Sequence, residues 1–291
     1  MNYFIVDTSY LVFYCSNSAF REYVFNEDIP RQKMSPEFDP TTDQEFVEIF
    51  KKKFSTMIDS AQKRYFPWYK EEVKLLLAID CHRKDLWRRE LYPAYKMNRD
   101  TKDKSKDKFN IEKVFEFAYQ SIIPGIEGAI IVDNPVAEAD DIIYVMCKKF
   151  GQEKDSRVIV LSGDRDMVQL CRENVSVISA FGEERNPKQE FLHIAKLKDK
   201  DVTDNISAGD FLLFKILMGD SGDNIPPIKR GFGPKTSARY VLDKSHEELK
   251  KLFKDDPMAE EGYRRNKSLI AMGDIPKMVT ESINATIDFL I

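Results

Sequence analysis

The sequence contains little that could build a disulfide framework or a zinc site. Its 291 residues include four cysteines and three histidines, and no two cysteines form a CxxC pair. Secreted disulfide scaffolds and zinc knuckles depend on such spacings, so we expect a reducing compartment and neither feature. No histidine stands in an HExxH motif or beside the nucleophile of a catalytic triad, although residues far apart in sequence can still pair in space. The chemistry must be sought among the carboxylates.

Long apolar runs are also absent. No run approaches the ~18 residues that a membrane span needs, and the first residues, MNYFIVDTSY, lack the basic start of a signal peptide. We therefore expect a cytoplasmic protein that is not secreted and has no membrane partner. With 42% hydrophobic and 32% charged residues, the chain has the balance of a soluble globular protein with one large domain or two small ones.

Short apolar runs alternate with helical patterns through the first part of the chain. Continuous apolar strands separated by helices are typical of a parallel sheet covered on both faces, which predicts an α/β fold. The polar, proline-containing stretch 21–44 is expected to be an extended loop. Amphipathic helices are predicted from about Phe46 to Ala61, from Ile111 and from about Ala137. The predicted strands are Tyr3–Asp7, Val73–Asp80, Ala129–Val132, Arg157–Ser162 and Val175–Ser179.

From about Asp199 onward the strand patterns stop. Helical segments at Ala208–Met218 and Lys235–Leu242 flank a stretch rich in glycine and proline, and a charged helical tail follows. We therefore predict two parts, a core with the sheet over residues 1–198 and an appended helical region over residues 199–291.

Acidic residues recur at the ends of the predicted strands and at the starts of helices. In an open α/β sheet the ligand crevice lies outside the carboxyl ends of the strands, where Asp7, Asp80 and Asp164 are expected. Glu138 and Asp141 lie one turn apart at the positive end of a helix. A single strand-end acid such as Asp133 is more typical of a cap or turn. The acids that form clusters are Asp7, Asp80, Glu138, Asp140, Asp141, Asp164, Asp166, Asp220 and Asp223.

Nine carboxylates that converge on one crevice would repel one another strongly unless cations neutralised them. Oxygen ligands without histidine or cysteine favour a hard ion, Mg²⁺ or Mn²⁺, over zinc. Their number suits two ions ~3.5–4 Å apart, one activating water and the other stabilising the leaving oxygen of a phosphodiester. The net charge of −4 does not exclude a nucleic-acid partner, because leaving out these nine acids gives 45 basic against 40 acidic residues, a charge of +5.

The order IVD…AID…EADD…SGDRD…GDSGDN…GFGPK resembles the flap-endonuclease and 5′–3′ exonuclease family, whose nuclease core is PIN-like. The likeness runs from Phe4 to about Leu242 and is greatest to bacteriophage flap endonucleases and phage ribonuclease H. Replacing Asp140 or Asp164 is expected to abolish cleavage. The resemblance implies a first metal site at Asp7, Asp80, Glu138 and Asp140 and a second at Asp164, Asp166, Asp220 and Asp223, with Asp141 close to both.

The segment GDNIPPIKRGFGPKTSARYVL resembles the helix–three-turn–helix of the same family, which would extend over about 208–242. Glycines let a backbone approach a phosphate closely, and a helix N-terminus offers free N–H groups to the anion. Gly231 and Gly233 lie in the turn, and Lys235 and Thr236 open the second helix. The resemblance implies contacts with duplex DNA here, and a K⁺ ion held between carbonyl oxygens and a DNA phosphate.

Residues 83–113 carry eleven Lys and Arg against six Asp and Glu, and they resemble the family's arch, under or through which the single strand passes. The resemblance implies that Lys96 and Arg99 contact the scissile phosphate and stabilise developing charge. Tyr95 is a candidate for stacking on an unpaired base, with ordinary packing as the alternative. The lysines within 102–108 are expected to form an exposed tip. Further candidates for steering the DNA backbone, which could equally form a solvated helix face, are Arg83, Lys84, Arg88 and Arg89.

These features together imply a structure-specific 5′-nuclease, acting near junctions of single strand and duplex in replication or repair. The expected substrates are DNA with a 5′ flap, a nick or a junction, and an RNA–DNA hybrid is a further candidate. We expect a monomer, and the likeness to phage enzymes favours a viral origin with replication proteins as candidate partners.

Two alternative functions stay open. A Mg-dependent phosphatase of the haloacid dehalogenase type would need a DxDx[TS] motif after the first strand, but Thr8 and Ser9 follow Asp7, so the second aspartate is missing. A catalytically inactive junction-binding protein on the same scaffold would be expected to lack several of the acids, whereas every cluster is present.

Overall fold

The structure is a computed structural model that describes the chain apart from residues 28–33, 68–72, 102, 154, 203–204 and 245. Five parallel strands form one sheet in the order β3-β2-β1-β4-β5, which confirms the predicted α/β fold. The predicted strands are all present, and their ends differ from the prediction by at most two residues. They are β1 (Asn2–Asp7), β2 (Val73–Ala78), β3 (Ala129–Val132), β4 (Arg157–Leu161) and β5 (Val175–Ile178).

The register of the strands brings their carboxyl ends together at one edge of the sheet. Asp7 at the end of β1 pairs with Ala78 of β2, and Val6 pairs with Leu161 of β4. Acids that follow these three strands therefore start from neighbouring positions.

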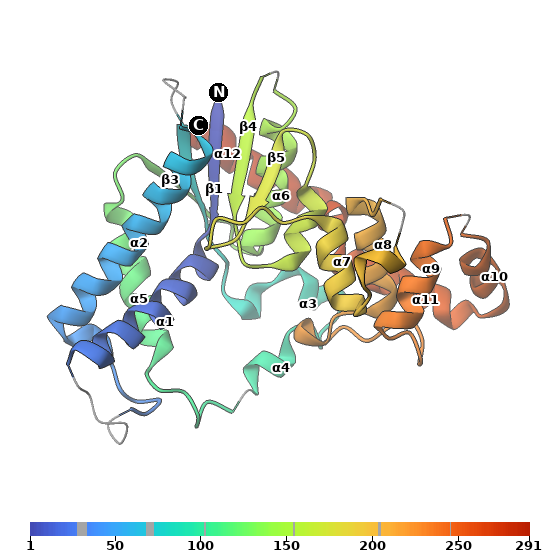
Figure 1. Ribbon diagram of the computed structural model, residues 1–291, viewed down its shortest axis with the longest axis horizontal. Coiled ribbons are helices and arrows are strands. Elements are labelled where there is room, and N and C mark those ends of the chain that lie inside the picture. The colour runs from blue at the N-terminus through green and yellow to red at the C-terminus, as the bar shows by residue number, and fades with distance from the viewer. Residues whose placement is uncertain (28–33, 68–72, 102, 154, 203–204, 245) are drawn as a thin grey trace.

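Helices cover both faces of the sheet, which is why β1 is buried at every position (Figure 1). Phe4 and Val6 pack on one face, and Tyr3 and Ile5 on the other, as the two-residue period of a strand requires. The first face is covered by α1 (Thr8–Asn26), α2 (Gln44–Tyr65) and α5 (Ile111–Phe117), and the second by α6 (Ala139–Phe150) and α12 (Lys277–Leu290).

Most of the remaining helices form a separate hydrophobic core beside the sheet, built around Phe191, Phe211 and Phe214. The last helix, α12, instead returns to the sheet, where Ile283 and Ile287 are fully buried. Among the residues described, no helix has both the length and the apolar character needed to cross a membrane. The helices beside the sheet are α7 (Pro187–Ala195), α8 (Ala208–Met218), α9 (Pro234–Leu242), α10 (Glu247–Asp255) and α11 (Pro257–Ile270).

Between β2 and α5 the chain leaves the sheet and returns to it along the lower edge of Figure 1. It contains two short helices, α3 (Trp87–Leu91) and α4 (Met97–Asp100), which are too short to be stable alone. Leu86 and Tyr95 anchor this segment in an apolar cluster with Ile216 of α8 and Leu269 of α11. The base of the predicted arch is thus packed, whereas residues 103–106 are exposed; Lys102 of the predicted tip lies outside the described residues.

The prediction of an extended loop over 21–44 was wrong at its start. Helix α1 continues to Asn26, because Phe20 and Tyr23 on its inner face are buried against the aromatic cluster of α2. Residues 28–33 of the predicted loop lie outside the described residues. After them the chain contains only a short 3₁₀ helix, Pro40–Thr42, before α2.

Candidate active site

The acid at the end of β1 has a structural task as well as its place at the sheet edge. Asp7 caps α1 by accepting a hydrogen bond from the N–H of Tyr10 at 3.0 Å, and its second oxygen accepts from Ser162 Oγ at 2.7 Å. Burial and, after it, the Asp80 carboxylate raise the pKa of Asp7 to about 7. The ionised form of Asp7 is therefore destabilised in the folded protein.

The acids that follow β2 and β4 are more exposed. Asp80 accepts a hydrogen bond from the N–H of Ala139 at 2.8 Å, which ties the end of β2 to the start of α6. Asp164 caps a short 3₁₀ helix by accepting from the N–H of Asp166 at 2.7 Å. Burial raises the pKa of Asp166 to about 7 although Lys215 opposes the shift.

The start of α6 brings three acids to the same edge. Glu138 is the N-cap residue, and Asp141 closes a capping box with it. Asp140 lies between them, and burial together with the Asp164 and Asp7 carboxylates raises its pKa well above the usual value. Five acids from three parts of the chain line a small cavity of ≈ 20 Å³, about the space of one water molecule; they are Asp140, Asp164, Asp166, Asp220 and Asp223.

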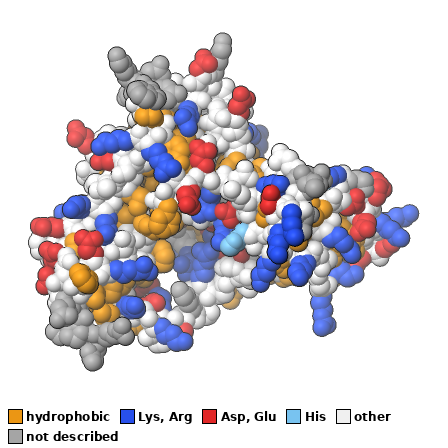
Figure 2. Space-filling view, in the orientation of Figure 1, with side chains coloured by type: hydrophobic (Ala, Val, Ile, Leu, Met, Phe, Trp, Pro, Cys, Tyr) orange, Lys and Arg blue, Asp and Glu red, His pale blue; other side chains and the backbone are white. Residues whose placement is uncertain are grey.

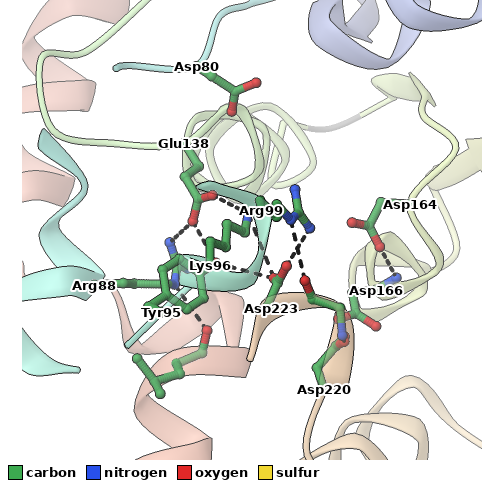
Figure 3. A network of polar contacts seen from close by, with 12 residues as sticks. Asp80, Arg88, Tyr95, Lys96, Arg99, Glu138, Asp164, Asp166, Asp220 and Asp223 are labelled. Carbon is green, nitrogen blue, oxygen red and sulfur yellow. Dashed lines mark hydrogen bonds and ion pairs between the residues drawn. The ribbon is translucent and has the colours of Figure 1, made fainter. Parts of the chain in front are cut away.

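Basic side chains lie between these acids (Figure 3). Lys96 donates a hydrogen bond to Glu138 and lies 3.7 Å from Asp223, and Arg99 pairs with Asp223. Burial alone would raise the pKa of Glu138, but Lys96 and Arg88 hold it down at about 2. In Figure 2 acidic and basic side chains lie side by side at the centre of the face, with more basic side chains over the α7–α9 region.

A buried lysine on α8 was missed by the sequence analysis. Lys215 Nζ lies 2.7 Å from Asp220 Oδ2 and 3.1 Å from Asp166 Oδ1, and the side chain is 9% exposed. Its signal was available, because a single lysine interrupts the apolar run FLLFKILM. A lysine in such a run is buried only when carboxylates pair with it.

The donor set fits hard cations, because every candidate ligand is a carboxylate. In the part of the chain that the structure describes, no three acidic, histidine or cysteine side chains stand together in a way that could hold a metal ion. Lys96, Arg99 and Lys215 separate them. Burial and, after it, neighbouring carboxylates nevertheless keep the pKa values of Asp7, Asp140 and Asp223 raised, so further positive charge would stabilise their ionised forms.

The structure corrects the predicted roles of Arg88 and Tyr95 and buries Asp141. Arg88 is buried and paired with Glu138 and Asp141, so it cannot steer DNA from the surface. Tyr95 is 3% exposed and donates its hydroxyl to Glu138 at 2.8 Å, which leaves packing rather than base stacking. Asp141 is fully buried against Arg88 and is not among the five acids that line the cavity.

The other predicted arch residues lie nearer the surface. Arg83 and Arg89 both pair with Asp100, at 2.8 and 2.6 Å, and Lys84 is exposed. The hydrogen bonds of Arg83 and Arg89 to the exposed Asp100 carboxylate are typical of a solvated face. Both arginines could exchange Asp100 for a phosphate at little cost.

The glycine-rich turn is open where the sequence analysis expects a phosphate. Gly231 has φ +95°, a left-handed conformation that other residues adopt rarely. A Cβ added to Gly233 would meet no protein atom within 4 Å. Gly233 is the N-cap of α9, no side chain caps this helix, and Lys235 is exposed and Thr236 half-buried in its first turn. The backbone N–H groups at the start of α9 are therefore available to an anion.

The fold and the site define an α/β protein with a five-stranded parallel sheet, acids at the carboxyl edge of that sheet and a helical region beside it. The model of one family, "5'-3' exonuclease, N-terminal resolvase-like domain", matches residues 4–204. The chain belongs to this family.

Curated relatives agree with that membership. The 5'-3' exonuclease of Aquifex aeolicus is 29% identical over 188 residues, which are 65% of this chain and 57% of the relative. DNA polymerase I of Mycobacterium tuberculosis (strain ATCC 25618 / H37Rv) is 28% identical over 169 residues, 57% of this chain but only 17% of the polymerase. The chain thus matches little more than half of the former relative and a small part of the latter.

Solved structures share the fold over the whole chain. A bacteriophage T5 protein co-crystallised with metal ions aligns with a TM-score of 0.66 at 20% identity, covering 100% of this chain and 99% of that one. A bacteriophage T5 flap endonuclease in a complex with DNA and metal ions aligns with a TM-score of 0.60 at 19% identity and the same coverage. At this identity the likeness establishes the fold.

The crowding of acids predicts a stability that depends on pH when no metal is present. The pKa of Asp7 is higher in the folded chain than in the unfolded chain, so the folded state holds the proton longer and its stability falls as pH rises from about 4 through 7. Asp7→Asn keeps a side-chain cap for α1 and removes the charge. In EDTA, the melting temperature of the variant minus that of the wild type should increase by about 5 °C from pH 5 to pH 8.

Thermal unfolding followed by circular dichroism over this pH range measures the difference. Asp133→Asn, at a strand end outside the cluster, is the matched control and should follow the wild type. A pH-independent difference for Asp7→Asn would mean that burial and the neighbouring acids do not destabilise the ionised form of Asp7.

Proposed function

We propose that the protein is a structure-specific 5′-nuclease that hydrolyses phosphodiester bonds near junctions between single strand and duplex. The proposal is based on the contact between a set of acidic side chains and a set of basic side chains. Glu138 at the carboxyl edge of the sheet and Asp223 after α8 pair with Lys96 and Arg99, which come from the basic segment 83–113. Neighbouring acids for cations and basic groups for a phosphate are what phosphoryl transfer to water requires.

The cations would be two Mg²⁺ or Mn²⁺ ions. Asp7, Asp80, Glu138 and Asp140 would hold the first, and Asp164, Asp166, Asp220 and Asp223 the second. When bound, such ions lower the pKa of water and stabilise the charge on the leaving oxygen. The preference for hard ions rests on the donor set, which is oxygen alone.

Lys96 and Arg99 would bind the scissile phosphate. Lys96 is 11% exposed at its side chain and touches both acid clusters, through Glu138 and Asp223. Arg99 is 47% exposed and pairs with Asp223 from the outer side. A phosphate that enters between them would meet two fixed cations, and both would stabilise charge that develops on its oxygens.

The turn at Gly231 and Gly233 would hold the duplex, with Lys235 and Thr236 beside it. Free N–H groups at the start of α9 favour a phosphate, and the missing Cβ atoms allow close approach. A K⁺ ion between the turn's carbonyl oxygens and the DNA would fit the same place. The substrate would then be a 5′ flap, a nick or a gapped junction, and an RNA–DNA hybrid is the second candidate.

We expect cleavage to require a divalent hard cation. Purified protein should cut a labelled 5′ flap in Mg²⁺ or Mn²⁺ and lose all measurable activity in excess EDTA, because uncompensated acids cannot bind a phosphate. Gel analysis of flap, nicked and RNA–DNA hybrid substrates measures both the requirement and the preferred substrate. Full-rate cleavage in EDTA would rule out the metal mechanism.

Asp140→Asn and Asp164→Asn should each reduce turnover by roughly 10²–10³-fold or more. Folding and junction binding in Ca²⁺ should persist, because asparagine keeps the shape of each side chain. Asp140→Asn should also raise the melting temperature in EDTA, since it removes a charge from a crowded site. Single-turnover cleavage and fluorescence anisotropy separate the effects, and near-wild-type turnover would show that the acid concerned does not take part.

Gly233→Val should weaken binding to duplex without disturbing the fold. Gly233 has φ −84°, which valine can adopt, and the added atoms would meet no protein atom at Cβ. They would block the approach of a phosphate, so affinity for a double flap should fall about tenfold while affinity for single strand changes little. Lys235→Ala should act more mildly and reduce the salt dependence by about one phosphate contact. Titrations in Ca²⁺ at several salt concentrations measure this, and equal losses on both substrates would place the turn on the single strand.

A further inference from the structure

Both carboxylate oxygens of Asp141 accept hydrogen bonds from buried neighbours. Its Oδ1 accepts a hydrogen bond from Arg88 Nη2 at 2.7 Å. Its Oδ2 accepts three, from Arg88 Nη1 at 2.8 Å, Trp87 Nε1 at 2.9 Å and the N–H of Glu138 at 3.1 Å. The side chain is fully buried. Binding a cation there would break a bidentate pair in a fully buried place, which is costly.

Arg88 is held on all sides as well. Nη1 also donates to Glu138 Oε2 at 3.0 Å, and Nε donates to the carbonyl of Leu269 in α11 at 3.0 Å. Its guanidinium lies 4.3 Å from the centroid of the Trp87 ring. The side chain is 4% exposed. A guanidinium with this set of partners has one position, fixed by acceptors on two other helices.

The two oxygens of Glu138 have different partners as a result. Oε2 accepts from Arg88 at 3.0 Å and from the hydroxyl of Tyr95 at 2.8 Å, and both donors are buried. Oε1 accepts from Lys96. Oε2 is therefore tied to the arch base, and Oε1 is the oxygen that faces the candidate site.

We propose that the Arg88–Asp141 ion pair is a positioning device for Glu138, and that Asp141 is not a metal ligand. The role rests on the proposed metal centre, to which Glu138 contributes. Arg88 fixes the orientation of the Glu138 carboxylate, and Asp141 fixes Arg88. Groups that orient a ligand in this way commonly change metal affinity 10–100-fold when they are altered.

The same pair connects Glu138 with the region of the glycine-rich turn. Arg88 donates to Leu269 of α11, and Asn266 of the same helix donates to the carbonyls of Ile216 (2.9 Å) and Pro226 (2.8 Å). Pro226 lies between Asp223 and the turn. Hydrogen bonds of Arg88 therefore join the arch base to the start of α6 and to α11, and Asn266 joins α11 to α8 and to Pro226.

The test is the affinity of the full-length protein for Mn²⁺ without DNA, measured by calorimetry or by electron paramagnetic resonance. Asp141→Asn and Arg88→Lys should each weaken the binding of one ion by about 10–100-fold. The double variant should be no worse than either single variant, because both changes break the same pair. If Asp141 were instead a direct ligand, Asp141→Asn would lower the affinity while Arg88→Lys left it unchanged, and the proposal would fail.

A variant without either charge separates positioning from stability. Arg88→Met combined with Asp141→Leu removes both charges, and apolar replacement of a buried pair is often neutral for stability. We expect its melting temperature to lie near that of the wild type while its Mn²⁺ affinity stays low. Recovery of the wild-type affinity in this variant would show that the pair serves the fold alone.

A more exposed ion pair, between Arg89 of α3 and Asp100 of α4, provides the control. Arg89 Nη2 and Asp100 Oδ2 lie 2.6 Å apart, with side chains 21% and 42% exposed. Arg89→Lys and Asp100→Asn should change Mn²⁺ affinity less than twofold. If the wild type binds no Mn²⁺, the proposed metal centre is contradicted. If the wild type and every variant bind Mn²⁺ equally well, only the proposed role of Arg88 and Asp141 is contradicted.

Discussion

The concentration of negative charge at one edge of the sheet is the constraint on which the rest of the structure depends. Parallel strands place Asp7 and the acids of α6 within reach of one another, and burial makes their ionised forms costly. Basic groups from other parts of the chain reduce that cost. Lys96 comes from the arch and Lys215 from α8, so compensating the charge also assembles these parts around the sheet.

Much of this architecture follows from local sequence. A strand followed by an acid is a local pattern, and the register of a parallel sheet then brings such acids together without further information. The strands and the α6 acids could therefore be predicted almost to the residue. The extension of α1 to Asn26 could not, because it depends on the burial of Phe20 and Tyr23 against α2, which is distant in sequence.

Arg88 and Tyr95 were misplaced for a related reason. Both stand in a segment dense with charge, which is typical of a solvated surface. Their burial depends on acceptors that lie 43 to 53 residues away on α6, Glu138 and Asp141. Nothing in the local pattern separates Arg88, 4% exposed, from its neighbour Arg89, 21% exposed. The difference is decided by which face of α3 packs against the start of α6.

The two kinds of cation in the arch suit different tasks. Arg99 pairs with Asp223 while about half of its side chain is exposed, so exchanging that carboxylate for a phosphate costs little. Arg88 could not make such an exchange, because leaving Asp141 would strand two charges in a dry interior. A buried ion pair adds little to stability compared with apolar packing. Its presence beside a candidate metal ligand is therefore better explained by the precision with which it holds Glu138 than by any gain in folding free energy.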